Sequence, residues 1–277
     1  RNLADFIFEL PPKHEQLKLK EFLWTLQNSI DKLENLIEKT KNYMVSRRES
    51  LLTRGIGHTK FKKVPWLFGK EIEIPQEWDW QQISNNSTLK GRIGWQGLTT
   101  REYRQEGKFY LVTGTDFKNG RIDWDNCVYV DEIRYKQDTN IQLKNNDVLI
   151  TKDGTIGKIA YVDSLSIPST LNTGVFVVRP MDGKYIPLFF YHVLFSDYFI
   201  KFLDKLKAGT TINHLYQKDF NTFYFPLPPL PEQQKIISIL SNINKQITQQ
   251  QSHLTNLYTL QDSILNSKLT KEKVIAQ

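Results

Sequence analysis

The feature that most constrains this chain of 277 residues is an internal repeat. Residues 6–23 read FIFELPPKHEQLKLKEFL, and residues 223–240 read FYFPLPPLPEQQKIISIL. Aligned without a gap, the two stretches share a phenylalanine start, a Leu-Pro-Pro step and a Glu-Gln pair. The chain therefore contains two copies of one unit, with a longer segment between them.

Each copy has the sequence of a short strand followed by a long helix. The Pro-Pro pair removes backbone donors and fixes φ, so it ends the strand and suits the residues just before a helix. Glu15-Gln16 and Glu232-Gln233 then fall in the first helical turn. A carboxylate and an amide there face unpaired N–H groups and the positive end of the helix dipole.

Both predicted helices carry an apolar heptad pattern. The spacing alternates between four and three residues, with polar breaks such as Thr40, Arg47 and Gln250. At the usual rise per residue, each helix would be roughly 55 to 60 Å long. So long a helix with one narrow apolar stripe needs a partner, and we expect the two to pair; two helices on separate cores are the alternative. The coiled-coil seam comprises Leu19, Leu23, Leu26, Ile30, Leu33 and Ile37, with Ile236, Leu240, Ile243, Ile247, Leu254 and Leu257.

The segment between the helices is predicted to be an α+β domain that is mostly sheet. Gly55 and Gly57 end the first helix, and a linker leads into IEIPQEWDW at residues 72–80. We expect a helix over Tyr185–Lys207 and a final strand over Asp219–Phe225. The predicted strands before that helix are separated by Gly, Asn and Asp turns and cover Phe109–Val112, Asn126–Val130, Asp147–Thr151, Lys158–Val162 and Val175–Arg179.

Composition limits the class of protein without fixing its function. The formal net charge of +7 permits a nucleic-acid partner, but the basic excess is spread thinly over the chain. The most apolar window, Tyr185–Leu206, is interrupted by charged residues and is not a membrane anchor. The single cysteine, Cys127, rules out an internal disulfide framework and fits a reducing, cytoplasmic location. It is expected to be a small core residue.

This order of elements resembles the DNA-specificity subunit (S subunit) of type I restriction-modification systems. The phrases that carry the resemblance are the two LPP..EQ helix starts, IPQEWDW at 74–80, DVLITKDGTIGKIA at 147–160 and KAGTTINHLYQKDF at 207–220. The resemblance implies two long helices that form an antiparallel coiled coil, with a target recognition domain between them. The domains are then 1–59, the end of a preceding recognition domain plus the first conserved helix; 60–226, the recognition domain; and 227–277, the second conserved helix. Residues 1–10 would come either from a longer subunit or from a natural half-subunit.

The resemblance also implies partners and the absence of catalysis in this chain. A specificity subunit directs adenine methylation and restriction to a bipartite target on double-stranded DNA. Methyltransferase subunits carry S-adenosylmethionine, a restriction (motor and nuclease) subunit completes the complex, and no cofactor or metal is bound by the specificity subunit. Because this chain has one recognition domain, two copies pairing through their helices would read a target with inverted-repeat symmetry.

Four loops combine glycine, a basic group and short hydroxyl or amide side chains: residues 89–97, 114–121, 151–158 and 207–214. Glycine allows close backbone approach, lysine and arginine neutralise phosphate, and Thr, Asn and His can meet base edges. For GTIGK a tight hairpin without DNA contact is an equal alternative, as is an ordinary structural role for His214; for Trp95, plain packing is the stronger reading. The DNA-binding candidates are Arg92, Trp95, Lys118, Arg121, Lys152, Thr155, Lys158, Lys207, Thr211, Asn213 and His214.

Catalytic patterns do not emerge from the sequence. TKDGTIGKI lacks the P-loop spacing, since Gly154 and Gly157 are too close and Ile159 follows Lys158. The five histidines and Cys127 show no zinc-ligand spacing. Two other readings stay open: a coiled-coil scaffold whose middle domain binds a protein, which predicts no salt-dependent DNA affinity, and an enzyme, which predicts turnover by the isolated chain.

Overall fold

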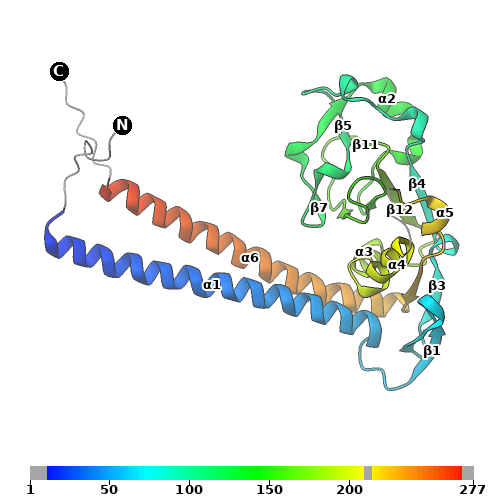
Figure 1. The fold of residues 1–277 in the computed structure, drawn as a ribbon, viewed down its shortest axis with the longest axis horizontal. Helices are drawn as coiled ribbons and strands as arrows, with labels where there is room; N and C mark the ends of the chain where they lie inside the picture. Colours follow the sequence, from blue (N-terminus) through cyan, green and yellow to red (C-terminus); the bar gives the residue numbers. More distant parts are fainter. Residues whose placement is uncertain (1–10, 209–213, 270–277) are drawn as a thin grey trace. The chain divides into compact units, whose positions relative to one another are not determined.

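The computed structural model describes residues 11–208 and 214–269 of the chain. It divides into two compact units, which are described separately below (Figure 1). One unit contains residues 1–47 and 239–277, and the other contains residues 48–238. The division falls within both long helices, so the second unit includes the last turns of the first helix and the first turns of the second.

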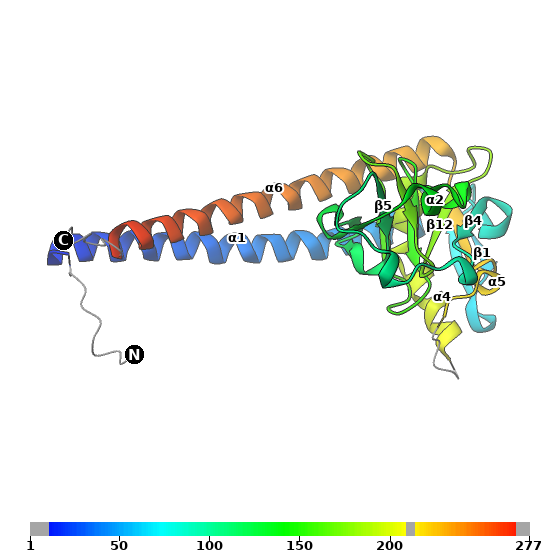
Figure 2. The same cartoon turned by 90° about the horizontal axis from the view of Figure 1, so that it is seen from above.

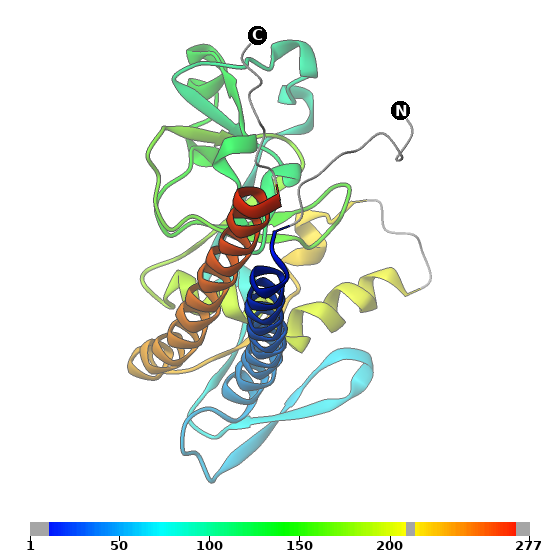
Figure 3. The same cartoon turned by 90° about the vertical axis from the view of Figure 1, so that its left-hand side faces the viewer.

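The first unit is a pair of helices that lie side by side (Figures 2 and 3). Helix α1 spans Lys13–Arg54 and helix α6 spans Leu230–Leu269, and each extends into the second unit. Tyr258 donates its hydroxyl hydrogen to Glu34 at 2.6 Å, and the Gln261 amide donates to Gln27 at 3.0 Å. The residue numbers of these pairs run in opposite order, so the helices point in opposite directions.

The apolar heptad positions lie along one side of each helix. In the first unit, Leu26, Ile30 and Ile37 are buried, as are Leu240, Ile243 and Ile247; Leu19, Leu23, Leu33, Leu254 and Leu257 are half-buried. Ile236 is buried in the second unit. The stripe is narrow because only every third or fourth residue is apolar, and the faces beside it are solvated.

The two copies of the repeat build the same helix start. The Gln16 side-chain amide donates to the carbonyl of Pro11 at 2.6 Å, and Gln233 donates to Pro228 at 2.8 Å. Glu15 and Glu232 each donate their backbone N–H to the second proline of the pair, at 2.9 Å in both copies. The Leu-Pro-Pro step followed by Glu-Gln is thus a local capping device, which the sequence alone can specify.

The second unit contains several small sheets. The largest has four antiparallel strands in the order β10-β9-β12-β4, and a three-stranded sheet has the order β11-β5-β8, with β11 and β5 parallel. Pairs β1-β2, β13-β3 and β6-β7 complete the set. The strands are β1 Phe61–Pro65, β2 Glu71–Pro75, β3 Asp79–Gln82, β4 Ser87–Gly91, β5 Phe109–Val112, β6 Phe117–Lys118, β7 Arg121–Ile122, β8 Val128–Val130, β9 Val148–Thr151, β10 Ile159–Tyr161, β11 Ser169–Leu171, β12 Val175–Pro180 and β13 Tyr224–Leu227.

Short helices connect these strands. The α-helices are α2 Glu132–Lys136, α3 Pro187–Leu194, α4 Asp197–Lys207 and α5 Gln217–Phe220. The 3₁₀ turns are η2 Leu67–Gly69, η3 Ile83–Asn85, η4 Gly94–Gln96, η5 Thr100–Glu102, η6 Gly114–Asp116, η7 Trp124–Asn126 and η8 Thr139–Ile141.

Besides a small apolar cluster of Leu98, Leu111 and Val130, two apolar cores hold the second unit together. The sheet core contains aliphatic side chains from six strands, among them Val112, Leu149, Ala160, Leu171 and Val177. Strands β9, β10 and β11 are buried along their whole length. Their sequences therefore do not alternate between apolar and polar residues, as a strand with one solvated face would. The second core is aromatic and forms where α3 and α4 meet β13; it includes Phe190, Phe199, Phe202, Phe223 and Phe225.

Two expected elements differ from the structure. The helix predicted over 185–207 is two helices, because the chain turns at Phe195 and Ser196. There the backbone N–H of Ser196 donates to Val193, and its carbonyl accepts from Phe199 in the next helix. The strand predicted over 219–225 begins only at Tyr224, and Asp219 and Phe220 belong to α5. Both differences lie in apolar runs whose periodicity does not separate one short element from the next.

A partly buried polar cluster connects the start of α6, the end of α1 and residues 56–78. Glu232 accepts from the Trp78 indole at 2.8 Å and from the Ile56 backbone at 3.0 Å, and the His58 ring nitrogen Nε2 lies 2.9 Å from the same carboxylate. Gly55 has φ of +67°, and a Cβ there would clash with His58 and Trp78. Within the described residues, no helix is long and apolar enough to cross a membrane.

Candidate nucleic-acid interface

Thr151, the last residue of β9, anchors the loop that joins β9 to β10. Its buried hydroxyl donates to the Thr155 carbonyl at 2.5 Å and accepts from the Lys158 backbone N–H at 2.9 Å. Gly154 and Gly157 have φ of +65° and +85°, which only glycine adopts without strain. The loop is therefore a rigid turn, and Thr155 and Lys158 are exposed on its outside.

The other three loops adjoin this turn. Gly114 lies so close to Thr151 that a Cβ would be 2.7 Å from the threonine methyl. His214 pairs with Asp153 through its ring nitrogen Nδ1 and through a backbone bridge. The Lys152 backbone donates to Gly174 at 2.8 Å, which joins the turn to residues 172–174.

The 89–97 loop reaches the same place through residues 172–174. A Cβ at Gly97 would lie 2.8 Å from the Thr173 methyl, and the Leu98 backbone donates to the Asn172 side chain at 3.2 Å. We call the described residues of these four loops the loop surface: 89–97, 114–121, 151–158, 207–208 and 214. The fold brings them together from separate parts of the sequence.

The β6-β7 hairpin contributes two cations to the loop surface. Asn119 and Gly120 at its tip both have positive φ, as a two-residue hairpin turn requires. Lys118 is exposed and pairs with Asp123 at 3.2 Å. Arg121 is half-buried, pairs with Asp163 at 2.9 Å and lies over the Tyr161 ring. Lys118 is therefore the more available cation, since a single exposed ion pair is weak.

A groove of about 350 Å³ runs beside the hairpin. It is lined on one side by Asn119, Gly120 and Lys158, and on the other by Phe199, Ile200 and Leu203 of α4. Lys158 thus stands at the edge of an apolar hollow next to the hairpin tip. Helix α4 forms the wall of this hollow.

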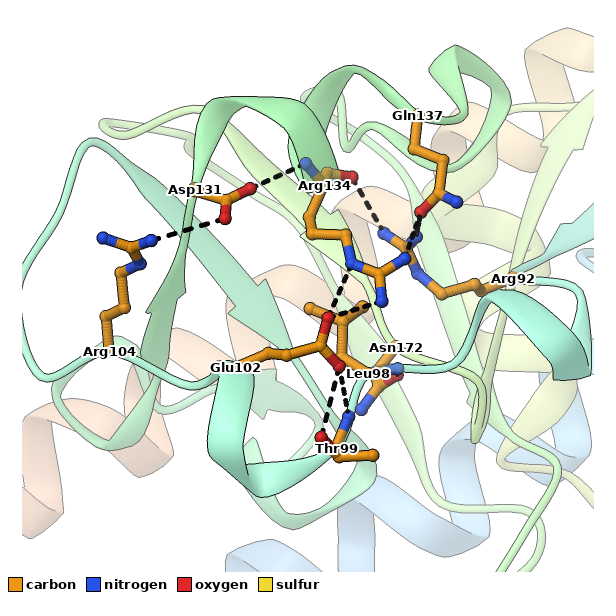
Figure 4. A network of polar contacts seen from close by, with 9 residues as sticks. All are labelled: Arg92, Leu98, Thr99, Glu102, Arg104, Asp131, Arg134, Gln137 and Asn172. Carbon is orange, nitrogen blue, oxygen red and sulfur yellow. Dashed lines mark hydrogen bonds and ion pairs between the residues drawn. The ribbon is translucent and has the colours of Figure 1, made fainter.

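The Arg92 side chain is buried and bonded within the protein, which does not favour the predicted DNA contact. Its side chain is only 1% exposed. The guanidinium donates to the Leu171 carbonyl at 2.8 Å and to the Thr170 hydroxyl at 3.2 Å. It also donates to the Gln137 side chain at 3.0 Å (Figure 4). Burial, followed by the charge of Arg134, lowers its pKa. With its donors directed at protein acceptors, Arg92 braces the loop rather than facing solvent.

Figure 4 shows that this brace is part of a wider network. The Arg134 guanidinium meets Glu102 and also donates to Gln137 at 3.0 Å, while Asp131 accepts from the Arg134 backbone at 2.9 Å. Glu102 in turn accepts from the Thr99 backbone at 2.9 Å. The segment around Thr99 is therefore held by hydrogen bonds to the charged Glu102 and Arg134 side chains, and such charge-assisted bonds are stronger than neutral ones.

Lys152 is also turned inward. Only 9% exposed, its ammonium lies 5.2 Å from the centre of the Phe176 ring. Burial lowers the pKa of this ammonium. A DNA contact by Lys152 is therefore at odds with its position, although its backbone holds two neighbouring segments together.

The remaining predicted residues have varied positions. Lys207 is exposed and lies 3.9 Å from Asp204, and His214 is half-buried against Asp153 and Tyr216. The backbone of Trp95 lies in η4, and its side chain is outside what the structure describes. Thr211 and Asn213 lie outside the described residues.

Two residues that the sequence analysis did not single out extend the loop surface. Tyr216 is 55% exposed, and its ring lies 4.6 Å from that of His214. The Lys218 ammonium stands 5.6 Å from the centre of the Tyr216 ring. The signal was an aromatic residue two positions before a basic one, shortly after the KAGTTINH segment. Such pairs can stack on nucleic-acid bases while neutralising phosphate.

The described residues of this surface form no candidate metal-binding site. Within residues 11–208 and 214–269, no three His, Cys, Asp or Glu side chains gather to hold a metal ion. Cys127 is buried in the sheet core, and burial, followed by Asp116, raises the pKa of its thiol.

Comparison with known proteins identifies a sequence family. The model of the family described as "Type I restriction modification DNA specificity domain" matches residues 96–256. The EcoBI specificity subunit of a type I restriction enzyme from Escherichia coli is 23% identical over 274 residues, which cover 93% of this chain and 57% of that protein. The MjaVIII specificity subunit from Methanocaldococcus jannaschii is 25% identical over 270 residues, covering 94% of this chain and 60% of that protein. The chain thus spans less than two thirds of these relatives.

Solved structures with the same fold agree. The type I restriction-modification S subunit from M. genitalium superposes with a TM-score of 0.58 at 18% identity, over 94% of this chain and 62% of that one. A chain from a study of complex assembly and conformational transition in the type I R-M system gives 0.60 at 18% identity, over 95% of this chain and 61% of that one. The family resemblance expected from the LPP..EQ helix starts is confirmed.

Proposed function

We propose that this chain, which belongs to the family of type I restriction-modification DNA specificity domains, recognises one half of a two-part DNA target and carries out no chemistry itself. Partner subunits would supply adenine methylation, with S-adenosylmethionine as their cofactor, and restriction. The observation that carries the proposal is the loop surface: four separate segments meet around the rigid Thr151 turn.

The loop surface has the chemistry that double-stranded DNA requires. Lys118, Lys158 and Lys207 are exposed and can neutralise phosphates, which sets the register of the domain on the duplex. Thr155 is exposed on the same surface and can hydrogen-bond to a base edge or a phosphate. Each good base contact discriminates by about 1 to 3 kcal/mol, so a few suffice for a half-site.

Buried cations support this surface from within. Arg92 donates to the Leu171 carbonyl, and the Lys152 ammonium lies over the Phe176 ring while its backbone bonds to Gly174 and Leu215. Buried cations that support the loops and exposed groups that contact DNA are compatible roles, because a loop that reads DNA must hold its hydrogen-bond donors in fixed positions before DNA binds. We therefore assign DNA contact to the exposed group, which consists of Lys118, Thr155, Lys158, Lys207, Tyr216 and Lys218.

Residues 60–226 are proposed as the target recognition domain, and the two long helices as an antiparallel coiled coil. Support comes from the buried heptad positions Leu26, Ile30 and Leu240 and from the cross-helix hydrogen bond of Tyr258 with Glu34. Such a pair would act as a ruler that sets the distance between two recognition domains on the duplex. A complex of this kind would act on DNA in the cytoplasm.

The second recognition domain could come from another copy of this chain. We propose that two copies pair through their helices and read an inverted repeat, because a two-fold dimer presents identical surfaces to both half-sites. Analytical ultracentrifugation at micromolar concentration tests this. A monomer at all concentrations would contradict it.

The experiment for the proposed function is a methylation map. The chain is co-expressed with the type I methyltransferase subunit from the same source, and N6-methyladenine is mapped across random-sequence DNA, with the methyltransferase alone as control. Methylation at one split motif only when the chain is present supports the proposal. Identical maps with and without the chain would refute it.

A further inference from the structure

A second cavity, of about 490 Å³, lies behind helix α4. Tyr198, Phe202 and Lys205 of α4 line it, whereas Phe199, Ile200 and Leu203 line the groove beside the loop surface. At the helical spacing of 100° per residue, these two sets lie on nearly opposite faces of α4. The cavity and the groove beside the loop surface are therefore on different sides of α4.

Aromatic rings form the walls of this cavity. The Trp80 ring lies 5.7 Å from Tyr198 and 6.1 Å from Tyr224, and the Trp66 ring lies 6.2 Å from Tyr198. The rings come from β3, α4, β13 and the residue between β1 and η2, and they hold one another in place without closing the space. Pre-formed aromatic pockets of this kind receive the large anchor side chains that dominate protein interfaces.

The rim of the cavity exposes further apolar surface. Phe68, at the tip of the β1-β2 hairpin, is 66% exposed and has a φ of +57°, an unfavourable conformation for a bulky residue. It adjoins Trp66 and Leu67, which line the cavity. An aromatic side chain held in solvent next to an aromatic pocket makes a patch larger than a small ligand needs, as expected of a protein-docking site.

The charge around the cavity indicates what its occupant carries. None of the residues that line it is acidic. Lys205 lines it and is exposed, and among the described residues no carboxylate pairs with it. Lys201 lies 5.4 Å from the Trp66 ring, but its charge is offset by Asp197 at 2.6 Å. The net preference is for an apolar anchor next to an acidic group.

We propose that this cavity, together with Phe68, is a docking site for the methyltransferase subunit, which would insert one large apolar side chain flanked by acidic residues. The proposal rests on the proposed function for the identity of the partner. An occupant would press on Tyr198 and Phe202, while Leu203 on the other face of α4 lies against Gly157 of the Thr151 turn. The docked subunit would thus contact one face of α4 while the opposite face supports the loop that binds DNA.

Two exposed positions test the proposal without risk to the fold. Phe68→Ser removes the rim aromatic, and Lys205→Glu reverses the charge. Their matched controls on the same domain are Ile133→Ser, which removes another exposed apolar side chain, and Lys184→Glu, which reverses another exposed lysine. The affinity of each purified chain for the methyltransferase subunit is measured by isothermal titration calorimetry without DNA.

We expect Phe68→Ser and Lys205→Glu each to weaken methyltransferase binding by about tenfold or more, because interface anchors carry most of the binding energy, and the controls to stay within about twofold. Wild-type affinity in both test variants would overturn the docking site and leave the proposed function intact. Loss of DNA affinity with methyltransferase binding unchanged would also overturn it, since the cavity would then belong to nucleic acid. A wild-type chain that binds DNA but no methyltransferase would overturn both the docking site and the proposed partner.

Discussion

Replacing Glu232 by alanine should strongly destabilise the recognition domain. The carboxylate accepts from the Trp78 indole, from the Ile56 backbone and from the His58 ring. Trp78 is 0% exposed, so its N–H would be left without a partner or water, at about 1 to 3 kcal/mol. With the lost contacts to His58 and Ile56, we expect a total of roughly 3 to 5 kcal/mol in the free energy of unfolding.

The assay is urea denaturation followed by tryptophan fluorescence, with Glu15→Ala as the matched control. Glu15 occupies the equivalent position in the first copy of the repeat and is exposed, so its replacement should cost less than about 0.5 kcal/mol. The double variant Glu232→Ala with Trp78→Phe should be more stable than the sum of the single losses predicts, because the orphaned donor is gone. Equal, small effects of Glu15→Ala and Glu232→Ala would refute this account of the junction.

Three further predictions follow from burial and charge. Arg92→Ala should lower the free energy of unfolding by about 2 to 4 kcal/mol, because it removes a buried hydrogen-bonding side chain. Lys158→Ala should leave the free energy of unfolding unchanged and should reduce the slope of log DNA affinity against log salt concentration by about 0.9. The reverse pattern would contradict the assignment of the two cations. Burial, then the charges of Arg48 and Arg121, lower the pKa of His192 from 6.5 to about 3, so its ring is neutral in the fold and takes up a proton on unfolding between these values. Stability should therefore fall by up to about 1.4 kcal/mol per pH unit as the pH drops below 6.5, and urea titrations of His192→Gln should show a shallower dependence. Cys127 is buried with a raised thiol pKa, so a thiol reagent at pH 8 should label it only in denaturant; rapid labelling of the native protein would contradict its position.

The helices could be predicted closely because their signals are local and periodic. The Pro-Pro step, the Glu-Gln pair and the heptad spacing each act within a few residues, and the repeat supplied the same signals twice. The break at Ser196 could not be seen in the same way. It lies at the end of α3, an apolar run that is buried on several sides, and such a run has no single periodic face to show where it ends.

The loops of the candidate interface could be found from composition, but the direction of each side chain could not. Arg92 and Lys158 lie in similar glycine-containing, basic segments, yet one is buried and the other exposed. The difference depends on Gln137 and Thr170, which are distant in sequence and meet Arg92 only in the folded domain. Tertiary partners of this kind decide whether a cation faces DNA or supports the loop that does.

The most direct test of the central claim is a crosslinking map of the DNA contacts. Target DNA with photoreactive thymine analogues in the half-site is bound to this chain together with the methyltransferase, irradiated, and the linked peptides are identified by mass spectrometry. The account predicts crosslinks within residues 89–97, 114–121, 151–158 and 207–218. Crosslinks confined to the β1-β2 hairpin, or to the long helices, would contradict the claim that the loop surface reads the DNA.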